Sequence, residues 1–139
     1  MIFDLAGSLY GTAYAGGTGC PGGCGVVYSL DSAGHQTVLY SFTGTGDDGA
    51  FPWAGVDVDA AGNLYGTTNG GGARGAGVVY NVDAGGHQTV LDSFNGPDGA
   101  FPTAGGILDP SGNLFGTTKR RETLGAGVVF ETKNATMQR

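Results

Sequence analysis

The chain has 139 residues, of which 40% are hydrophobic and 13% are charged, and its net charge is −6. This length and apolar content are sufficient for one folded domain with a core, which excludes a disordered chain. The negative charge excludes a nucleic-acid partner, because a polyanion needs a basic surface. No apolar run approaches the roughly 20 residues of a membrane span. Thirty glycines separate short runs of Val, Leu, Tyr and Phe, which is typical of a turn-rich all-β protein.

One pattern is repeated three times along the chain, over residues 1–46, 47–96 and 97–139. The motif GAFP begins at positions 49 and 99, GNL at 62 and 112, and GVV at 77 and 127. The second and third copies are therefore in register, 50 residues apart. The first copy, which has GSL at 7 and GVV at 25, carries extra residues near Cys20 and near Gly46. Such insertions indicate loops, because an added residue in a strand would turn its buried face outward.

Each copy predicts four short strands and no helix. In the second copy the candidate strands are the apolar segments AGVDVD, NLYGTT, GVVYNVD and TVLDSF. Gly, Asn or Asp bounds each segment, and none has the spacing of three and four residues that a helix requires. In the segment TVLYSF of the first copy, alternation predicts Val38, Tyr40 and Phe42 on one face and Leu39 on the other. Apolar residues on both faces indicate a sheet that is buried between sheets.

Tight turns are expected between these strands. In DAAGNLYG, the tetrad from Ala60 to Asn63 predicts a turn joining two antiparallel strands, and Gly62 and Asn63 are the residues best able to adopt a positive φ. The segments LDSAGHQTV and VDAGGHQTV predict hairpin turns from the third strand of a copy to its fourth strand.

Four strands in every 50 residues predict a β-propeller-like array of antiparallel blades. A parallel β-helix remains the alternative, although its rungs are about half this length. The first copy opens inside its first strand, and the third ends without a TVLxSF segment. We therefore expect about 2.75 blades in an open fan, with two uncovered blade faces that favour self-association.

The order of these motifs resembles the GloVer-type tandem repeat of bacterial proteins. The series D-x-x-G-N-L-Y-G-T-T, G-V-V-Y/F, G-x-x-T-V-L-x-S-F and D-G-A-x-P-x-A-G covers roughly residues 3 to 132. The first copy departs from it at Ser8 and Ala13, and the third in the loop KRRETL. The resemblance implies a propeller-like fold in an exported or surface-attached protein, and it implies no activity. The opening segment MIFDLAGSLYG lacks the basic and apolar regions of a signal peptide, so the location depends on the family.

Sequence motifs for catalysis and cofactor binding have structural explanations. Two segments, at 17–22 and 70–75, match G-x-G-x-x-G, but each precedes a GVVY strand rather than the helix that a dinucleotide site requires. His35 and His87 occupy equivalent positions of successive copies, whereas a catalytic base needs unlike neighbours. We therefore expect no catalytic residue, no metal site and no cofactor.

Two features occur in one copy alone. Cys20 and Cys24 lie in the loop where the first copy is longer, and the sequence Pro-Gly-Gly between them can fold tightly enough for a disulfide. A disulfide would imply an oxidising, extracytoplasmic compartment. Trp53 has Thr103 as its counterpart, so it is a candidate ligand contact, with packing in the core or at the rim as the alternative.

Two classes of function remain. The first is a noncatalytic exported repeat scaffold, part of a larger propeller-like protein, whose loops bind a glycan, a cell-wall component or another protein. The second is a fragment of a propeller enzyme, a hydrolase or lyase, whose active site lies in missing blades. Repetition of nearly every polar residue favours the first, because a catalytic site is built from unlike residues.

Overall fold

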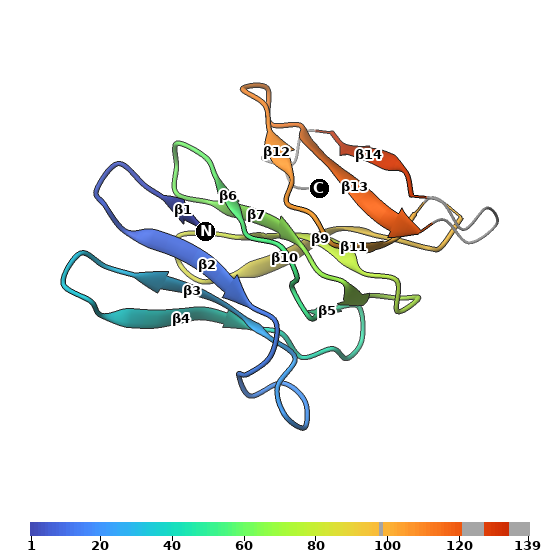
Figure 1. The fold of residues 1–139 in the computed structure, drawn as a ribbon, viewed down its shortest axis with the longest axis horizontal. Coiled ribbons are helices and arrows are strands. Elements are labelled where there is room, and N and C mark those ends of the chain that lie inside the picture. The colour runs from blue at the N-terminus through green and yellow to red at the C-terminus, as the bar shows by residue number, and fades with distance from the viewer. Residues whose placement is uncertain (98, 121–126, 134–139) are drawn as a thin grey trace.

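The structure is a computed structural model that describes residues 1–97, 99–120 and 127–133, and within these residues every helix or strand element is a strand. Figure 1 shows three sheets that follow one another along the chain and spread as an open fan, and none of them closes into a barrel. Every strand pair in the described ranges is antiparallel, so the alternative of a parallel β-helix is wrong. The all-β, propeller-like open array is confirmed.

The first two sheets share one strand order. The first sheet contains, in spatial order, β1 (Ile2–Phe3), β2 (Leu9–Ala13), β3 (Val26–Leu30) and β4 (Gln36–Ser41). The second contains β6 (Asp57–Val58), β7 (Leu64–Thr67), β9 (Val78–Val82) and β10 (Gln88–Ser93). These bounds agree with the four strands that the sequence predicts for each copy.

The third sheet repeats the first three of these strands. It contains β12 (Ile107–Leu108), β13 (Leu114–Arg120) and β14 (Val129–Thr132), and β11 (Ala100–Pro102) pairs with the far half of β13. The short pair β5 (Gly49–Ala50) and β8 (Gly70–Gly71) is the equivalent of β11 and β13. The expected lack of a fourth strand concerns residues 134–139, which lie outside the described residues.

A glycine lies opposite an aromatic residue at the centre of each sheet. The pairs are Gly11 with Tyr28, Gly66 with Tyr80, and Gly116 with Phe130. A Cβ atom on Gly66 would lie 2.6 Å from the hydroxyl oxygen of Tyr80, so the aromatic ring covers the glycine. This contact explains the glycine in the repeated LYG and LFG motifs, because a larger residue would displace the ring.

The core lies between the sheets, and the second sheet is buried on both faces. Val78, Tyr80 and Val82 pack toward the first sheet, whereas Val79 packs toward the third. Each interface contains an edge-to-face aromatic pair, with ring centroids 4.9 Å apart for Phe42 and Tyr80, and 5.0 Å apart for Phe94 and Phe130. Face-to-face stacking of sheets is the packing expected of propeller blades.

The GAFP motif carries the chain from one sheet to the next. The N–H of Phe51 donates to the carbonyl oxygen of Cys24 at 2.7 Å, and the N–H of Phe101 donates to that of Ala76 at 2.8 Å. Both phenylalanines have a positive φ, of 60° and 57°, which is an unfavourable conformation for a bulky side chain. The proline that follows packs on a glycine of the preceding sheet: a Cβ on Gly77 would lie 2.9 Å from Cδ of Pro102.

The turn predicted over Ala60 to Asn63 is present, and of its two candidate residues Gly62 has the positive φ, of 86°. One local expectation is wrong: in β4 the register shifts and Leu39 is an extra residue. Because of this bulge, Val38 pairs with Tyr28 and lies on the outer face of the first sheet, whereas Phe42 is fully buried. No helix in the described residues could cross a membrane.

Substitution of Gly66 by alanine tests the contact between glycine and ring. The added methyl group must displace Tyr80, which is fully buried between two sheets, so we expect the free energy of unfolding to fall by about 1–3 kcal/mol. Denaturant titration of the purified protein measures this change.

Gly85→Ala is the matched control. Gly85 is exposed in a hairpin turn, and the nearest atom to an added Cβ is a ring nitrogen of the exposed His87 side chain, at 3.1 Å. This variant should unfold as the unmodified chain does. Equal stability of the Gly66 and Gly85 variants would contradict the steric explanation.

Candidate binding site

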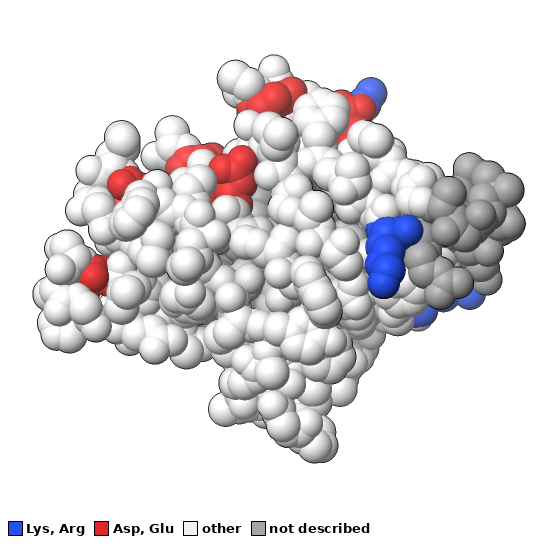
Figure 2. All heavy atoms as spheres, in the orientation of Figure 1, with Lys and Arg blue, Asp and Glu red and all other residues white. Residues whose placement is uncertain are grey.

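Five hairpin turns are organised by an aspartate at their first position. In each turn the carboxylate accepts hydrogen bonds from the N–H groups two and four residues further along the chain. The residue three positions along is a glycine with a positive φ. The five aspartates are Asp4, Asp31, Asp59, Asp83 and Asp109. Figure 2 shows acidic side chains at the tips of the hairpins. This is a turn of type I followed by a left-handed glycine, a common hairpin connection.

Backbone hydrogen bonds lower the pKa of these carboxyls. The N–H group four residues along is the main cause at Asp4, Asp31, Asp83 and Asp109. At Asp59 burial raises the pKa, but hydrogen bonds from Asn63, Tyr65 and Ala61 outweigh it, and the pKa lies below the ordinary value of 3.8. Burial, and then the bond to Asp59, raises the pKa of Tyr65 to about 12. The carboxylates of the turns are therefore charged at neutral pH and already hydrogen-bonded.

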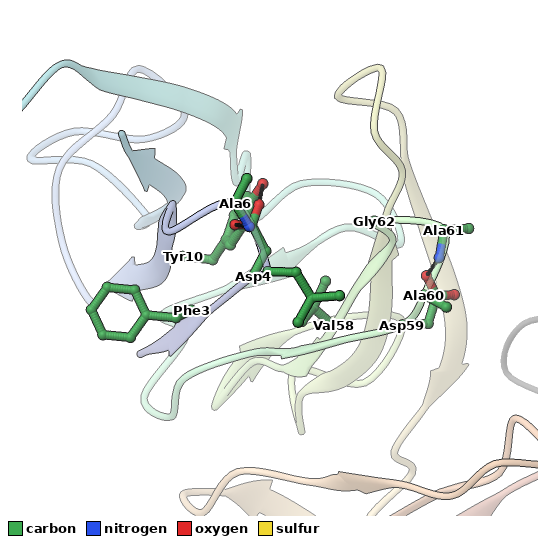
Figure 3. A pocket seen from close by; sticks show the side chains of 10 residues that line it. Phe3, Asp4, Ala6, Tyr10, Val58, Asp59, Ala60, Ala61 and Gly62 are labelled. Atoms are coloured by element: carbon green, nitrogen blue, oxygen red, sulfur yellow. Dashed lines mark hydrogen bonds between the residues drawn. The ribbon is translucent and has the colours of Figure 1, made fainter. Parts of the chain in front are cut away.

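Grooves lie between the turns of neighbouring sheets. The first, of about 540 Å³, has Phe3, Asp4 and Tyr10 on one side and Val58 and Asp59 on the other, as Figure 3 shows. A second groove, of about 490 Å³, lies between the turns 58–61 and 108–112. Both grooves are lined by residues of the repeated turns, and the carboxylates there already accept hydrogen bonds within their own turns. We therefore interpret the grooves as a consequence of the stacking of sheets.

The two histidines belong to the same turns. Nδ1 of His35 lies 3.1 Å from Oδ2 of Asp31, and Nδ1 of His87 lies 3.2 Å from both carboxylate oxygens of Asp83. Both imidazole rings are largely exposed. Each histidine therefore contacts the aspartate of its own turn, which is the arrangement of a structural residue.

The two segments that match G-x-G-x-x-G lie in connections between strands. Residues 17–22 precede β3, and residues 70–75 include β8 and precede β9. A strand follows each segment, so neither presents the helix N-terminus that holds a pyrophosphate. In the part of the chain that the structure describes, no group of three or more His, Cys, Asp or Glu side chains could hold a metal ion.

Cys20 and Cys24 form the disulfide expected in the first copy. Their Cα atoms are 5.5 Å apart, and the turn between them is closed by a hydrogen bond of 2.7 Å from the N–H of Gly23 to the carbonyl oxygen of Cys20. Cys24 is buried, and its carbonyl oxygen receives the N–H of Phe51. The disulfide therefore braces the loop on which the linker to the second sheet docks, and it fits an oxidising, extracytoplasmic setting.

Trp53 lies beside Tyr14 in an exposed aromatic cluster. The two ring centroids are 5.0 Å apart with the planes at 88°, and Tyr14 also stacks on Phe51 at 5.1 Å and 26°. Trp53 is 58% exposed and Tyr14 46%. With Thr12 and Pro52 they line a shallow hollow of about 360 Å³, and the Thr12 hydroxyl donates to the carbonyl oxygen of Ala54 at 2.9 Å. We call Tyr14 and Trp53 the aromatic platform.

Tyr14 is the member of this platform that sequence reasoning missed. Its counterparts in the second and third copies are Asn69 and Lys119, just as Thr103 is the counterpart of Trp53. A search for every position at which a single copy is aromatic would have found both residues, Tyr14 in the first copy and Trp53 in the second. The platform is therefore absent from the second interface, although the backbone repeats there.

These features define a repeat-containing module built from stacked four-stranded sheets. A family model, the Gloeobacter/Verrucomicrobia repeat, matches residues 1–139. The chain belongs to this family of repeats, as the motif order predicts. No curated protein matches the chain.

Acid should weaken the aspartate turns. A lowered pKa in the folded state means that a carboxylate stabilises the fold above its unfolded pKa, and that this stabilisation is lost as the pH falls through the folded value. We therefore expect the free energy of unfolding to decline below about pH 4. Asp59→Ala should lower it by about 2 kcal/mol at pH 7, since four hydrogen bonds are lost, and less at pH 3.

Denaturant titrations at both pH values measure this difference. Asp47→Ala, a substitution of an exposed loop aspartate, is the control and should have little effect at either pH. A loss at Asp59 that is the same at pH 3 and pH 7 would contradict the electrostatic part of the explanation.

Removal of the disulfide should reduce stability modestly. The loop that it closes is short, so the double variant Cys20→Ser, Cys24→Ser should lose about 1–2 kcal/mol. Alkylation of the unreduced protein followed by mass spectrometry should label neither cysteine. Two labelled thiols in the natively folded protein would refute the bond.

Proposed function

We propose that the chain is a noncatalytic, exported repeat scaffold that binds a glycan through the aromatic platform. The observation that carries this proposal is the exposure of two perpendicular aromatic side chains, Tyr14 and Trp53, at one end of the first interface between sheets. Neither residue is repeated in the other copies, so the stacking of sheets does not require them.

The shape and chemistry of the platform suit a sugar ring. The C–H face of a pyranose packs against the face of an exposed indole, and the Tyr14 ring, at 88° to it, forms a corner that limits how the sugar lies. The platform is held by stacking on Phe51, so little side-chain entropy remains to be lost on binding. An exposed tryptophan also contributes strongly where a ligand covers it.

The scaffold role is supported by what the polar side chains do. The aspartates of five turns, and the histidines beside two of them, form hydrogen bonds within their own hairpins. These side chains therefore stabilise the repeated turns. Export is supported by the disulfide, because such bonds persist in oxidising compartments.

The single tryptophan makes the proposal directly measurable. Trp53 is the only tryptophan of the chain, so intrinsic fluorescence reports on the platform alone. A screen on an array of bacterial-wall and plant oligosaccharides should identify a ligand that changes this fluorescence, with a dissociation constant from about 10 μM to about 1 mM. Trp53→Ala should abolish retention on the array, and Trp53→Phe should retain part of it.

Thr103→Ala is the matched control, because Thr103 occupies the equivalent position in the third copy. It should bind as the unmodified chain does. Equal glycan binding by Trp53→Ala, or failure of every glycan on the array to bind, would refute the proposed site.

A further inference from the structure

Within the described residues, one face of the third sheet is not covered by another sheet. The residues on this face are exposed, although their counterparts in the other sheets are packed between sheets. Val79 on the second sheet is fully buried against the third sheet, but its counterpart Val129 is 77% exposed. Ile107 and Phe115 are exposed as well. Figure 1 shows the third sheet at one end of the fan, with the second sheet between it and the first.

These residues match the inward face of the first sheet in residue type. Ile107, Phe115 and Val129 are the counterparts of Ile2, Tyr10 and Val27. In the first sheet this set packs against the second sheet. The third sheet thus exposes an apolar surface that resembles the face of the first sheet that the second sheet covers.

The outer face of the first sheet is the complementary half. The second sheet packs against the first through Leu64, Tyr80 and Val82, all of which are buried. The counterparts in the first sheet are Leu9, Tyr28 and Leu30, and these lie on its outer face, where Phe3 and Val38 are exposed. One chain therefore carries both halves of an inter-sheet interface, at opposite ends.

We propose that two copies of the chain associate head to tail, with the third sheet of one copy stacked on the first sheet of the next. The contact is heterologous, because it joins two different faces, and each pair leaves one face of each kind free for further copies. It continues the stacking that already joins the three sheets within one chain. The sequence predicts self-association of the uncovered faces, and the head-to-tail contact specifies which two faces meet.

One charged residue should weaken this contact. Glu131 pairs with Phe115 across β13 and β14 and shares its exposed face, whereas the equivalent residue on the covered face of the second sheet is Asn81. A carboxylate that loses water at an interface without a partner opposes burial. Glu131→Asn should therefore strengthen association, with a dissociation constant at least threefold lower.

Sedimentation velocity from about 10 μM to about 1 mM tests the proposal, because weak interfaces dissociate in this range. The unmodified chain should show a mass average that rises with concentration. Val129→Arg places a charge on the third sheet and Val38→Arg on the first, both at exposed positions. Each should raise the dissociation constant at least tenfold and leave the thermal midpoint unchanged.

A mixture of the two variants identifies the direction. Each variant keeps the face that the other has lost, so an equimolar mixture should recover dimers that neither variant forms alone, and nothing larger. Face-to-face pairing of like sheets would instead be blocked by only one of the substitutions, with no recovery on mixing. That result, or a strictly monomeric unmodified chain at about 1 mM, would overturn the proposal.

Discussion

The arrangement of the three sheets depends on how the GAFP motif joins one sheet to the next. Phe51 donates its N–H to the carbonyl oxygen of Cys24, which lies just before β3 of the first sheet. Its own carbonyl oxygen accepts the N–H of Asn69, which follows β7 of the second sheet, so a single residue connects two sheets. Its positive φ costs on the order of 1–3 kcal/mol. The two hydrogen bonds and the burial of Pro52 offset this cost. Because Phe101 has nearly the same φ, the same geometry is produced at the second interface.

This junction also explains which glycines the repeat requires. Gly25 and Gly77, which precede the first two GVV strands, have a positive φ, and each lies beneath the proline ring of the following GAFP motif, Pro52 or Pro102. The glycine of LYG lies beneath the aromatic ring of the neighbouring strand. Phe130 replaces Tyr80 at that ring position, so the repeat requires the ring and not the hydroxyl. In agreement with this, the Tyr80 hydroxyl is buried without a hydrogen-bond partner.

The strands, the antiparallel pairing and the disulfide were predictable because local chemistry decides them. Alternating apolar residues, turn glycines and two cysteines separated by Pro-Gly-Gly are visible in the sequence. The positive φ of Phe51 was not predictable, since contacts with two sheets impose a conformation that phenylalanine disfavours. The bulge at Leu39 was likewise missed, because a register shift belongs to a strand pair and not to either strand. Tyr14 went unrecognised because it lies in the loop where the copies differ in length.

Repetition separates the residues that build the fan from those that give the first interface between sheets its own surface. A residue that positions one sheet on another must recur wherever sheets stack, as the GAFP phenylalanines do. The disulfide, Tyr14 and Trp53 do not recur, and they are physically linked. Cys24 holds Phe51 through its carbonyl oxygen, Phe51 supports Tyr14, and the rings of Tyr14 and Trp53 meet edge to face. The platform can therefore vary between copies without altering the stacking, because it is attached to the junction rather than inserted into the core.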